Sequence, residues 1–361
     1  MNPVKKLHDF GQSPWMDYIH RRSLEQGDLE RQVREDGISG VTSNPSIFQK
    51  AIGSGTAYDD ALKRLSCENP RASGMWLFEQ LAVADIQAAA DVLRPVYDET
   101  EGRDGFVSLE VSPYRAYDTA GTIRQAERLF ETADRPNVMI KVPATSAGIP
   151  AIEELIARGL NVNITLMFSL DHYEAVAEAY IRGLERLEVP ERLGRIASVA
   201  SFFVSRVDGK VDPLLERQGS EEAKALSGKI AIANSKLAYR RFREIFHGER
   251  FAALAEQGAR VQRVLWASTS TKNPDYPDVL YVDELVGAET INTMPPETIE
   301  AYRDHGDPDE RLTDGVEEAE RQVESLARLG IDLDRVTEAL QREGVEKFAQ
   351  SFDELLATVE D

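Results

Sequence analysis

One lysine of this sequence stands where it could act as a nucleophile. Lys141 lies within the apolar run 137–145, Asn-Val-Met-Ile-Lys-Val-Pro-Ala-Thr, whose β-branched residues and flanking turn formers predict a buried strand. Burial disfavours the charged form of an amine, and a neutral amine can form a Schiff base with a carbonyl compound. From this stretch alone, a lysine that extends to the strand end or pairs with a carboxylate remains an equal alternative.

Other polar residues on predicted strands are placed to share an interior with this lysine. Side chains alternate along a strand and helices cover the outside of a parallel barrel, so we expect the polar faces to point inward. Each such residue could instead be structural, because inward polar groups often pair with one another and Asp17 could cap the following helix. Together, a nucleophilic amine, two carboxylates and amide donors are the parts that covalent and acid–base catalysis need. The predicted inward residues are Asp17, Glu110, Asn163, Thr165 and Ser201.

The scaffold that would position these residues is visible in the order of the segments. Short apolar segments alternate with helical patterns, which predicts an α/β fold with a single (β/α)₈ TIM barrel. The predicted strands are Trp15–Ile19, Ile38–Thr42, Phe106–Val111, Val138–Val142, Asn161–Leu166, Arg195–Val204, Val264–Ser268 and Glu289–Asn292. The predicted helices include Ser73–Tyr97, Asp118–Ala133, Ile149–Arg158, Leu170–Leu187, Ser220–Phe246 and Asp314–Leu329.

The end of the chain departs from the barrel pattern. Residues 332–359 have the periodicity of one or two amphipathic helices, which we expect to form a structural cap over the barrel. No linker rich in Pro, Gly or Ser interrupts the sequence, so we expect residues 1–361 to form a single domain, with about 307–361 as an appended helical C-terminal region. This region also holds the densest excess of acidic residues, which we expect on solvated faces.

Composition excludes several classes of protein. The formal charge of −21 argues against binding to nucleic acid or an anionic membrane, since both need a basic surface. No apolar run reaches the roughly 20 residues that cross a bilayer, and no signal peptide is visible at the N-terminus. A single cysteine, Cys67, excludes an internal disulfide framework and suits a cytoplasmic protein. The histidines are scattered away from the polar strand faces, so we predict no metal and no cofactor.

Four of the predicted strands contain longer motifs. They are GVTSNPSIF at 40–48, VSLEV at 107–111 followed by Tyr117-Asp118-Thr119, IKVPA at 140–144 and GLNVNITL at 159–166. In order and spacing, from about Gln12 to Pro295, the chain resembles the transaldolases of the class I Schiff-base aldolase superfamily. The resemblance implies a pentose-phosphate-pathway enzyme that moves a dihydroxyacetone unit between sugar phosphates. Sedoheptulose 7-phosphate and glyceraldehyde 3-phosphate would give erythrose 4-phosphate and fructose 6-phosphate.

The same resemblance implies a role for each matching residue. Lys141 would form the Schiff base with the C2 carbonyl of the ketose phosphate, and Asp17 would be the general acid and base of carbon–carbon cleavage. Glu110 and Thr165 would position a water that shuttles protons while the carbinolamine dehydrates. The hydroxyls of the dihydroxyacetone unit would bind a further set of polar residues. That set is Asn44, Asn163 and Ser201.

Phosphate recognition is where the sequence departs from the family pattern. Arg206 matches the family's first phosphate-binding arginine, and Ser268 matches a family residue at the end of the seventh strand. The second arginine that many transaldolases have after this strand is missing, with Ser270 at its aligned position. The nearest cation is Lys272, which we predict takes over this contact. The alternative is that Lys272 is an ordinary exposed loop lysine.

Two other functions compete with the transferase. The shorter fructose-6-phosphate aldolases resemble the same barrel and are lyases, but they tend to have Gln where this chain has Glu110 and Tyr where it has Phe203. A non-catalytic barrel that only binds sugar phosphates would be expected to have lost the lysine or a carboxylate, and neither is lost. The expected partners are therefore small sugar phosphates. A homodimer and a monomer both remain open.

Overall fold

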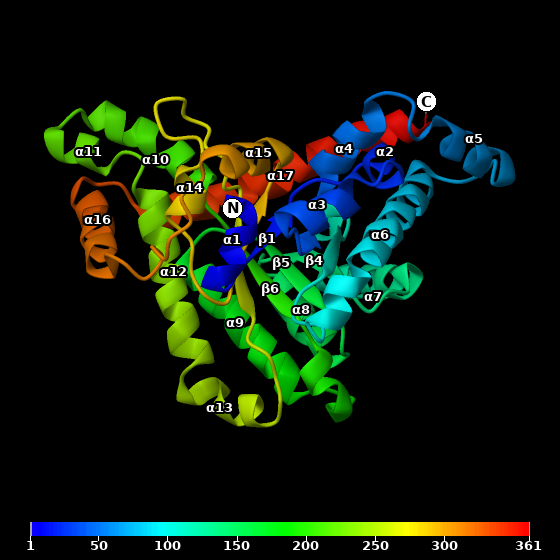
Figure 1. Ribbon diagram of the computed structural model, residues 1–361, viewed down its shortest axis with the longest axis horizontal. Helices are drawn as coiled ribbons and strands as arrows, with labels where there is room; N and C mark the ends of the chain where they lie inside the picture. The colour runs from blue at the N-terminus through cyan, green and yellow to red at the C-terminus, as the bar shows by residue number, and fades with distance from the viewer. Residues whose placement is uncertain (1, 361) are drawn as a thin grey trace.

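The computed structural model describes residues 2–360, and within them eight parallel strands close into a barrel in chain order, β1 to β8. Figure 1 shows the strands enclosed by helices, with the first helices in blue and the last in red. The strand bounds are β1 Gln12–Met16, β2 Gly40–Val41, β3 Phe106–Glu110, β4 Val138–Pro143, β5 Val162–Met167, β6 Ser198–Phe203, β7 Arg263–Ala267 and β8 Thr290–Met294. The predicted (β/α)₈ barrel is confirmed.

The predicted strand ends are less accurate than the strands themselves. β1 begins and ends three residues before the predicted segment Trp15–Ile19, so Asp17 follows the strand instead of lying within it. β2 is only the central pair of the predicted Ile38–Thr42. Ile19 and Ile38 are as buried as strand residues, at 2% and 1% exposed, although they lie outside the hydrogen-bonded ladder. An apolar pattern therefore indicates which segment is buried. It does not indicate which residues of that segment form hydrogen bonds with the neighbouring strand.

The helices of the outer layer begin where polar caps stand in the sequence. The side chains of Ser73, Asp118 and Ser169 accept backbone N–H groups at the starts of three of them. The helices of the outer layer are α6 Gly74–Glu99, α7 Thr119–Ala133, α8 Gly148–Ala157, α9 Leu170–Glu185, α12 Ile230–Phe246 and α15 Pro296–His305. Of these, α6, α7 and α9 are the three with the caps just named. The remaining α-helices are α1 Pro3–Lys6, α2 Arg21–Glu25, α3 Asp28–Asp36, α4 Pro45–Gly53, α5 Asp59–Glu68, α10 Ser205–Gln218, α11 Glu221–Leu226, α13 Glu249–Glu256, α14 Leu280–Asp283, α16 Val316–Arg328 and α17 Leu333–Glu360. The short 3₁₀ helices are η1 Leu7–Phe10, η2 Pro113–Arg115 and η3 Pro190–Arg195.

One helix prediction is wrong. The segment predicted as a single helix over 220–246 forms two helices, α11 and α12, separated by Ser227–Lys229. Gly228 has a φ of +72°, a left-handed conformation that other residues rarely adopt and that ends a helix. Its backbone N–H donates to Asp212 Oδ1 at 3.0 Å, so the break is held in place. Helical periodicity continues across it because both helices bury apolar residues.

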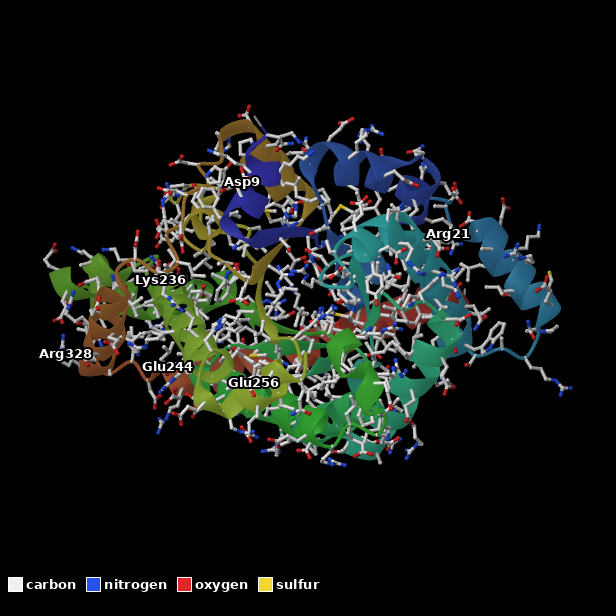
Figure 2. All side chains as sticks on the ribbon, turned by 60° about the horizontal axis from the view of Figure 1, so that its bottom comes forward. Asp9, Arg21, Lys236, Glu244, Glu256 and Arg328 are labelled. Atoms are coloured by element: carbon white, nitrogen blue, oxygen red, sulfur yellow. The ribbon has the colours of Figure 1, made fainter. Side chains whose placement is uncertain are left out.

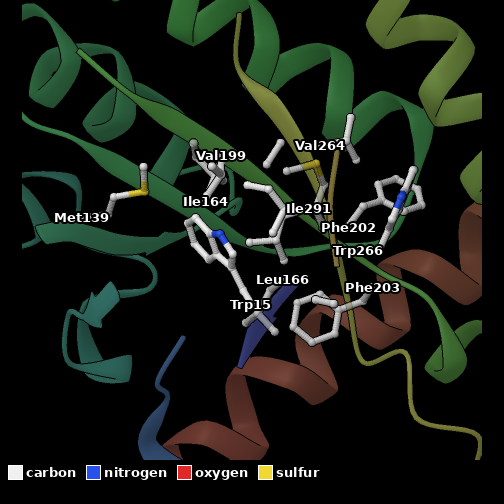
Figure 3. Close-up of a cluster of buried hydrophobic side chains, with 14 of the residues drawn as sticks. Trp15, Met139, Ile164, Leu166, Val199, Phe202, Phe203, Val264, Trp266 and Ile291 are labelled. Atoms are coloured by element: carbon white, nitrogen blue, oxygen red, sulfur yellow. The ribbon is translucent and has the colours of Figure 1, made fainter. Parts of the chain in front are cut away.

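The core has an apolar body and a polar base. Figure 3 shows large side chains from neighbouring strands packed together, with Phe202 of β6 edge-on to Trp266 of β7 at 6.2 Å between ring centroids. Beneath them, Trp15 Nε1 donates to Asp104 Oδ1 at 2.8 Å, and Arg263 lies 3.6 Å from the same carboxylate. The buried charge is therefore paired, which a low-dielectric interior requires.

The appended C-terminal region divides into two parts. Helix α16 packs on the outside of α12, where Lys236 donates to the carbonyl of Asp314 at 3.1 Å. Helix α17 crosses the barrel and packs on α4, α6 and α10; it is the red helix across the upper part of Figure 1. In Figure 2 the red and blue ends of charged side chains crowd the outer faces of the helices, including those of α12 and α16.

Helix α17 is fastened at several points along its length. Gln341 Nε2 donates to the carbonyls of Ala144 and Leu166, at 2.9 and 3.0 Å, just after β4 and at the end of β5. One hydroxyl contact, 2.7 Å long, joins Ser351 to Ser46 of α4. The helix also buries one apolar stripe against the body of the molecule. That stripe includes Val336, Leu340, Val345, Phe348, Phe352, Leu355 and Val359.

Candidate active site

A cavity of about 910 Å³ opens at the carboxyl ends of the strands, beneath α17. This is the end at which barrels of this kind hold their sites. Most of the residues predicted from the sequence line it: Asp17, Asn44, Lys141, Thr165, Ser201, Phe203, Arg206, Ser268 and Lys272. Glu110 and Asn163 do not line the cavity and lie behind these residues, on strands adjacent to Lys141. The structure therefore brings all the predicted residues into one region.

Lys141 lies at the bottom of the cavity, with its side chain on the inner face of β4. Strand pairing puts it beside Glu110 of β3 on one side and Asn163 of β5 on the other. Its Nζ lies 3.3 Å from Glu110 Oε2 and donates to the carbonyl of Ser43 at 3.1 Å. The lysine is 4% exposed. Lys141 is thus both paired with a carboxylate and open to the cavity. The two alternatives drawn from the sequence, a nucleophile and a paired lysine, are therefore compatible.

Glu110 is a buried carboxyl group beside the ammonium of Lys141. Burial raises its pKa, while the adjacent ammonium of Lys141 opposes that rise. The net direction is upward, so this carboxyl group holds a proton more readily than a solvated glutamate. A proton acceptor of raised pKa beside an amine can exchange a proton with it at low cost. Glu110 is therefore placed to handle the protons of chemistry at Lys141.

Asp17 follows the last residue of β1 and faces the cavity. Thr42 Oγ1 donates to Asp17 Oδ1 at 2.6 Å, and a 2.7 Å contact joins Thr42 to Thr293 of β8. Burial raises the pKa of Asp17; Lys141, Thr42 and Arg206 oppose it with smaller effects. The predicted alternative that Asp17 caps the next helix is wrong, because the ring of His20 accepts the N–H of Arg22 at the start of α2.

Three polar residues of β5 and β6 differ in how well they are satisfied. Ser201 Oγ donates to Asn163 Oδ1 at 2.7 Å, and Asn163 Nδ2 donates to Ser108 Oγ at 2.9 Å. This chain fixes the amide of Asn163 in one orientation. By contrast, Thr165 Oγ1 is buried and has no hydrogen-bond partner among residues 2–360. An unpaired buried hydroxyl is costly, so a water or a substrate group in the cavity is its natural partner.

Asn44 lies where β2 passes into α4. Its Oδ1 accepts the N–H of Ile47 at 3.0 Å and thereby caps the helix. This contact orients the side chain, and Nδ2 makes no hydrogen bond within the described part of the chain. The local motif Asn-Pro-Ser explains the arrangement, because Asn is a preferred cap and Pro45 suits the first helical position. The free amide nitrogen is available to an oxygen in the cavity.

The cationic end of the cavity is formed by β6, β7 and the loops after them. Arg206 lies in the first turn of α10 with its guanidinium 4.9 Å from the ring centre of Phe203, and burial lowers its pKa. Ser268, at a strained φ of +58°, contacts the hydroxyl of Ser205 at 3.0 Å. Lys272 lines the cavity and donates to Ser270 Oγ at 2.6 Å. Lys272 is nevertheless an exposed residue of the loop after β7, so its contact with the phosphate stays a prediction.

Helix α17 contributes a part of the site that the sequence analysis missed. It was expected only to cap the barrel, yet it lines the cavity with Leu340, Glu343, Gly344, Lys347, Phe348 and Ser351. The ring of Phe348 is 6.0 Å from Lys141 Nζ. The spacing of these residues, three or four apart, marks one face of a helix. That spacing was visible in the sequence, but nothing in it showed which surface the face would meet.

The arrangement combines three chemical capacities. The amine of Lys141 can attack a carbonyl carbon, the carboxyl groups of Asp17 and Glu110 can move protons, and cations at one end can bind an anion. Across residues 2–360, no three His, Cys, Asp or Glu side chains are grouped to hold a metal ion. In the same range, none of the helices has the length and apolar character that a membrane span requires.

Comparison with known proteins gives a consistent result. Residues 14–359 match the family model described as transaldolase/fructose-6-phosphate aldolase. A protein named transaldolase from Thiobacillus denitrificans is 48% identical over 360 residues, covering 99% of this chain and 100% of that protein. Transaldolase 1 of Streptomyces coelicolor is 48% identical, covering 99% of this chain and 93% of its own. Transaldolase 2 of a Nostoc species is 46% identical, covering 100% and 97%.

Proposed function

The chain belongs to the transaldolase/fructose-6-phosphate aldolase family, and we propose that it acts as the transaldolase of the pentose phosphate pathway. It transfers a dihydroxyacetone unit from a ketose phosphate to an aldose phosphate. The natural pair is sedoheptulose 7-phosphate with glyceraldehyde 3-phosphate, which gives erythrose 4-phosphate and fructose 6-phosphate. The observation that supports this most directly is the buried amine of Lys141, ion-paired with Glu110 and open to a cavity lined by cations.

Schiff-base formation begins the proposed reaction. Glu110, whose pKa burial raises, takes the proton of the Lys141 ammonium across 3.3 Å, and the neutral amine attacks C2 of the ketose. The carbinolamine then loses its hydroxyl group as water. A proton for that step comes through a water held between Glu110 and Thr165, whose hydroxyl has no hydrogen-bond partner among residues 2–360. The product is an iminium ion linked to Lys141.

Carbon–carbon cleavage follows at Asp17. Its carboxylate removes the proton of the C4 hydroxyl, the C3–C4 bond breaks, and the electron pair moves into the iminium group to give an enamine. The aldose phosphate leaves as an aldehyde. An acceptor aldehyde then takes its place, the enamine carbon attacks it, and Asp17 returns the proton to the new hydroxyl. Thr42 fixes the carboxylate for both transfers through its 2.6 Å hydrogen bond.

Binding of the substrate is divided between the two ends of the cavity. We propose that Asn44, Asn163 and Ser201 bind the hydroxyls of the dihydroxyacetone unit, with Phe203 packing beside them. Arg206, Ser268 and Lys272 bind the phosphate. Within the described part of the chain, neither the amide nitrogen of Asn44 nor the guanidinium of Arg206 has a hydrogen-bond partner, which supports this division. Asn163 lies deeper than the others, and it reaches the substrate through Ser201, to which it is hydrogen-bonded at 2.7 Å.

Borohydride trapping tests the mechanism. Incubation with fructose 6-phosphate and borohydride should attach one three-carbon unit to the enzyme, and peptide mapping should place it on Lys141. The variant Lys141→Met should accept no label, while Lys236→Met, which changes a lysine that does not line the cavity, should be labelled as the wild type is. A label on another lysine, or none at all, would refute the proposed mechanism.

A second experiment separates the transferase from the lyase within the family. With fructose 6-phosphate and no acceptor aldehyde, a transaldolase holds the dihydroxyacetone unit and turns over slowly. A fructose-6-phosphate aldolase releases free dihydroxyacetone rapidly. The presence of Glu110 and Phe203 supports the transferase. Rapid release of dihydroxyacetone without acceptor would replace it with the lyase.

Two broader features belong to the same proposal. We propose that residues 1–361 form one domain, supported by the packing of α17 on α4, α6 and α10. We also propose that the enzyme works in the cytoplasm, supported by its single, exposed and unpaired cysteine, Cys67. Its partners are small sugar phosphates, and either a monomer or a homodimer fits the observations.

A further inference from the structure

The charge of the cavity is opposite to that of the protein around it. The chain has a formal charge of −21, yet six cationic side chains line the cavity against three carboxylates. The carboxylates are Asp17, Glu297 and Glu343. The cations are Lys50, Lys141, Arg206, Lys210, Lys272 and Lys347. The cationic side chains oppose the negative potential of the acidic protein at this place. A cluster of cations of this kind favours an anion as ligand.

These cations differ in whether the protein neutralises them. Lys141 is paired with Glu110 at 3.3 Å, and Lys210 is paired with Glu343 at 2.5 Å. Within residues 2–360, neither Arg206 nor Lys347 has a carboxylate partner or a side-chain hydrogen bond. Lys50 and Lys272 also have no carboxylate partner in this range, and Lys272 donates to Ser270 Oγ. Arg206 and Lys347 come from different parts of the chain, Arg206 from the start of α10 and Lys347 from α17.

From this juxtaposition we propose that Lys347 of α17 binds the phosphate group of the substrate together with Arg206 and Lys272. The C-terminal helix would then be part of the substrate-binding site as well as a cap over it. This inference rests on the proposed function, since that function supplies the phosphorylated substrate. It adds a phosphate ligand that the sequence motifs did not indicate, on a segment outside the barrel.

The packing of α17 brings Lys347 toward Arg206. A Cβ atom added at Gly344 would lie 2.8 Å from Leu166 Cδ2 and 3.6 Å from Nη1 of Arg206, so the helix backbone rests directly against that residue pair. Lys347 is three residues further along and shares this face of the helix. The two hydrogen bonds of Gln341, one turn earlier, fix the helix at this height.

Electrostatics agrees with this geometry. The charge of Arg206 lowers the pKa of Lys347, and partial burial, Lys50 and Lys272 lower it further. The positive charges of Arg206 and Lys347 repel each other when no counterion lies between them. This repulsion destabilises the protein in the absence of substrate. A phosphate dianion between them removes the repulsion and gains attraction to both. The fork of Arg206 suits two phosphate oxygens, and the point charge of a lysine suits the third.

The test compares Lys347→Met with two other variants. Arg342→Met removes one positive charge from the same helix, at an exposed position that does not line the cavity, and serves as the control. Lys347→Arg restores the charge. Three quantities are measured for each: kcat and KM with fructose 6-phosphate, the inhibition constant of inorganic phosphate, and borohydride trapping with dihydroxyacetone, which has no phosphate.

We expect Lys347→Met to raise KM for fructose 6-phosphate and the inhibition constant of phosphate by about tenfold, with kcat changed by less than about threefold. Trapping with dihydroxyacetone should remain as in the wild type. Lys347→Arg should recover most of the affinity, and Arg342→Met should change nothing. Equal KM and inhibition constants in Lys347→Met and Arg342→Met would overturn the proposal. Loss of trapping with dihydroxyacetone in Lys347→Met would also overturn it, since that would show a distorted site.

Failure of the proposed function gives a different pattern. In that case the wild-type protein itself would show no transferase activity and no trapping with either compound. Binding of inorganic phosphate, measured by calorimetry on the wild type and on Lys347→Met, would still decide whether these cations form an anion site. Equal affinity in the two proteins would reject the role of Lys347 whatever reaction the enzyme catalyses.

Discussion

Replacing Gln341 by leucine should loosen α17 from the barrel. This side chain is 8% exposed, and its amide nitrogen donates to the carbonyls of Ala144 and Leu166 at 2.9 and 3.0 Å. Leucine fills nearly the same volume but donates nothing. Both carbonyl groups would then lie beneath the helix without a hydrogen-bond donor from Gln341. They stand at the ends of β4 and β5, the strands that hold catalytic and binding residues.

The size of the effect follows from these two contacts. Leaving one buried acceptor without its donor costs about 1–3 kcal/mol, so two together cost about 2–6 kcal/mol, and we use a value in the lower half of that range, about 3 kcal/mol. The leucine side chain buries extra apolar surface, which returns about 1 kcal/mol. We therefore expect a net loss of about 2 kcal/mol in the free energy of unfolding. Since Lys347 and Phe348 lie on the next turns, KM for fructose 6-phosphate should also rise.

Urea unfolding and amide hydrogen exchange measure this prediction. Exchange should accelerate in α17 before it does so in the strands, because the helix can detach while the barrel remains closed. Gln350→Leu is the matched control, since Gln350 lies on the exposed side of the same helix, where its side chain donates a hydrogen bond to Glu354. If Gln341→Leu unfolds as Gln350→Leu does, within about 0.5 kcal/mol, and α17 exchanges no faster, the two hydrogen bonds do not fasten the helix and the reasoning is wrong.

Three further predictions concern pH, proton transfer and the loop that bears Lys272. Burial raises the pKa of Asp208 from 3.8 to about 7. Between these two pH values the folded state therefore binds more protons than the unfolded state. The stability of the wild type should fall as pH rises from about 4 to 7, by up to about 4 kcal/mol. Asp208→Asn should remove that part of the slope in urea unfolding measured across this range, and parallel curves for the two proteins would contradict the assignment. Asp17→Asn should lower kcat by about 10²–10⁴ and still permit borohydride trapping with dihydroxyacetone; a variant that keeps its kcat would exclude Asp17 as the general base. Tyr276→Phe removes the 2.8 Å hydrogen bond to Asp212 that holds the loop between β7 and α14, so KM for fructose 6-phosphate should rise about threefold at constant kcat. An unchanged KM would mean that the Tyr276–Asp212 hydrogen bond does not position Lys272 for the phosphate.

The barrel and its inward residues follow from the sequence because they depend on local rules. Buried parallel strands are short and apolar, and their side chains alternate between the two faces. Because the outer face packs against helices, a polar side chain on a strand points to the interior of the barrel. Lys141, Thr165 and Ser201 were predicted in this way, and all three line the cavity. The family resemblance then located Asn44 and Arg206 at the starts of helices and Ser268 just after β7, where strand alternation gives no information.

The remaining features depend on contacts between distant segments. Thr42 holds the carboxylate of Asp17 and is itself in contact with Thr293 of β8, a residue 251 positions away, and no local pattern encodes that contact. The end of β1 was misplaced for a related reason, since Ile19 is buried by tertiary packing after the strand has ended. Helix α17 was recognised as amphipathic, but an amphipathic face does not specify its partner. Its role in the cavity depends on Gly344 and Gln341, which have no distinctive signal in a single sequence.

The position of α17 in the chain has a consequence for biosynthesis. All eight strands are complete by Met294, whereas the helix that covers the cavity begins at Leu333 and is made afterwards. At about 5–20 residues per second, the residues from 295 to 361 take several seconds to synthesise. During that interval a nascent chain can close its barrel while the cavity lacks its roof, and the amine of Lys141 faces the metabolites of the cell. The order of synthesis thus supplies every strand of the barrel before the residues of α17 that line the cavity, which begin at Leu340.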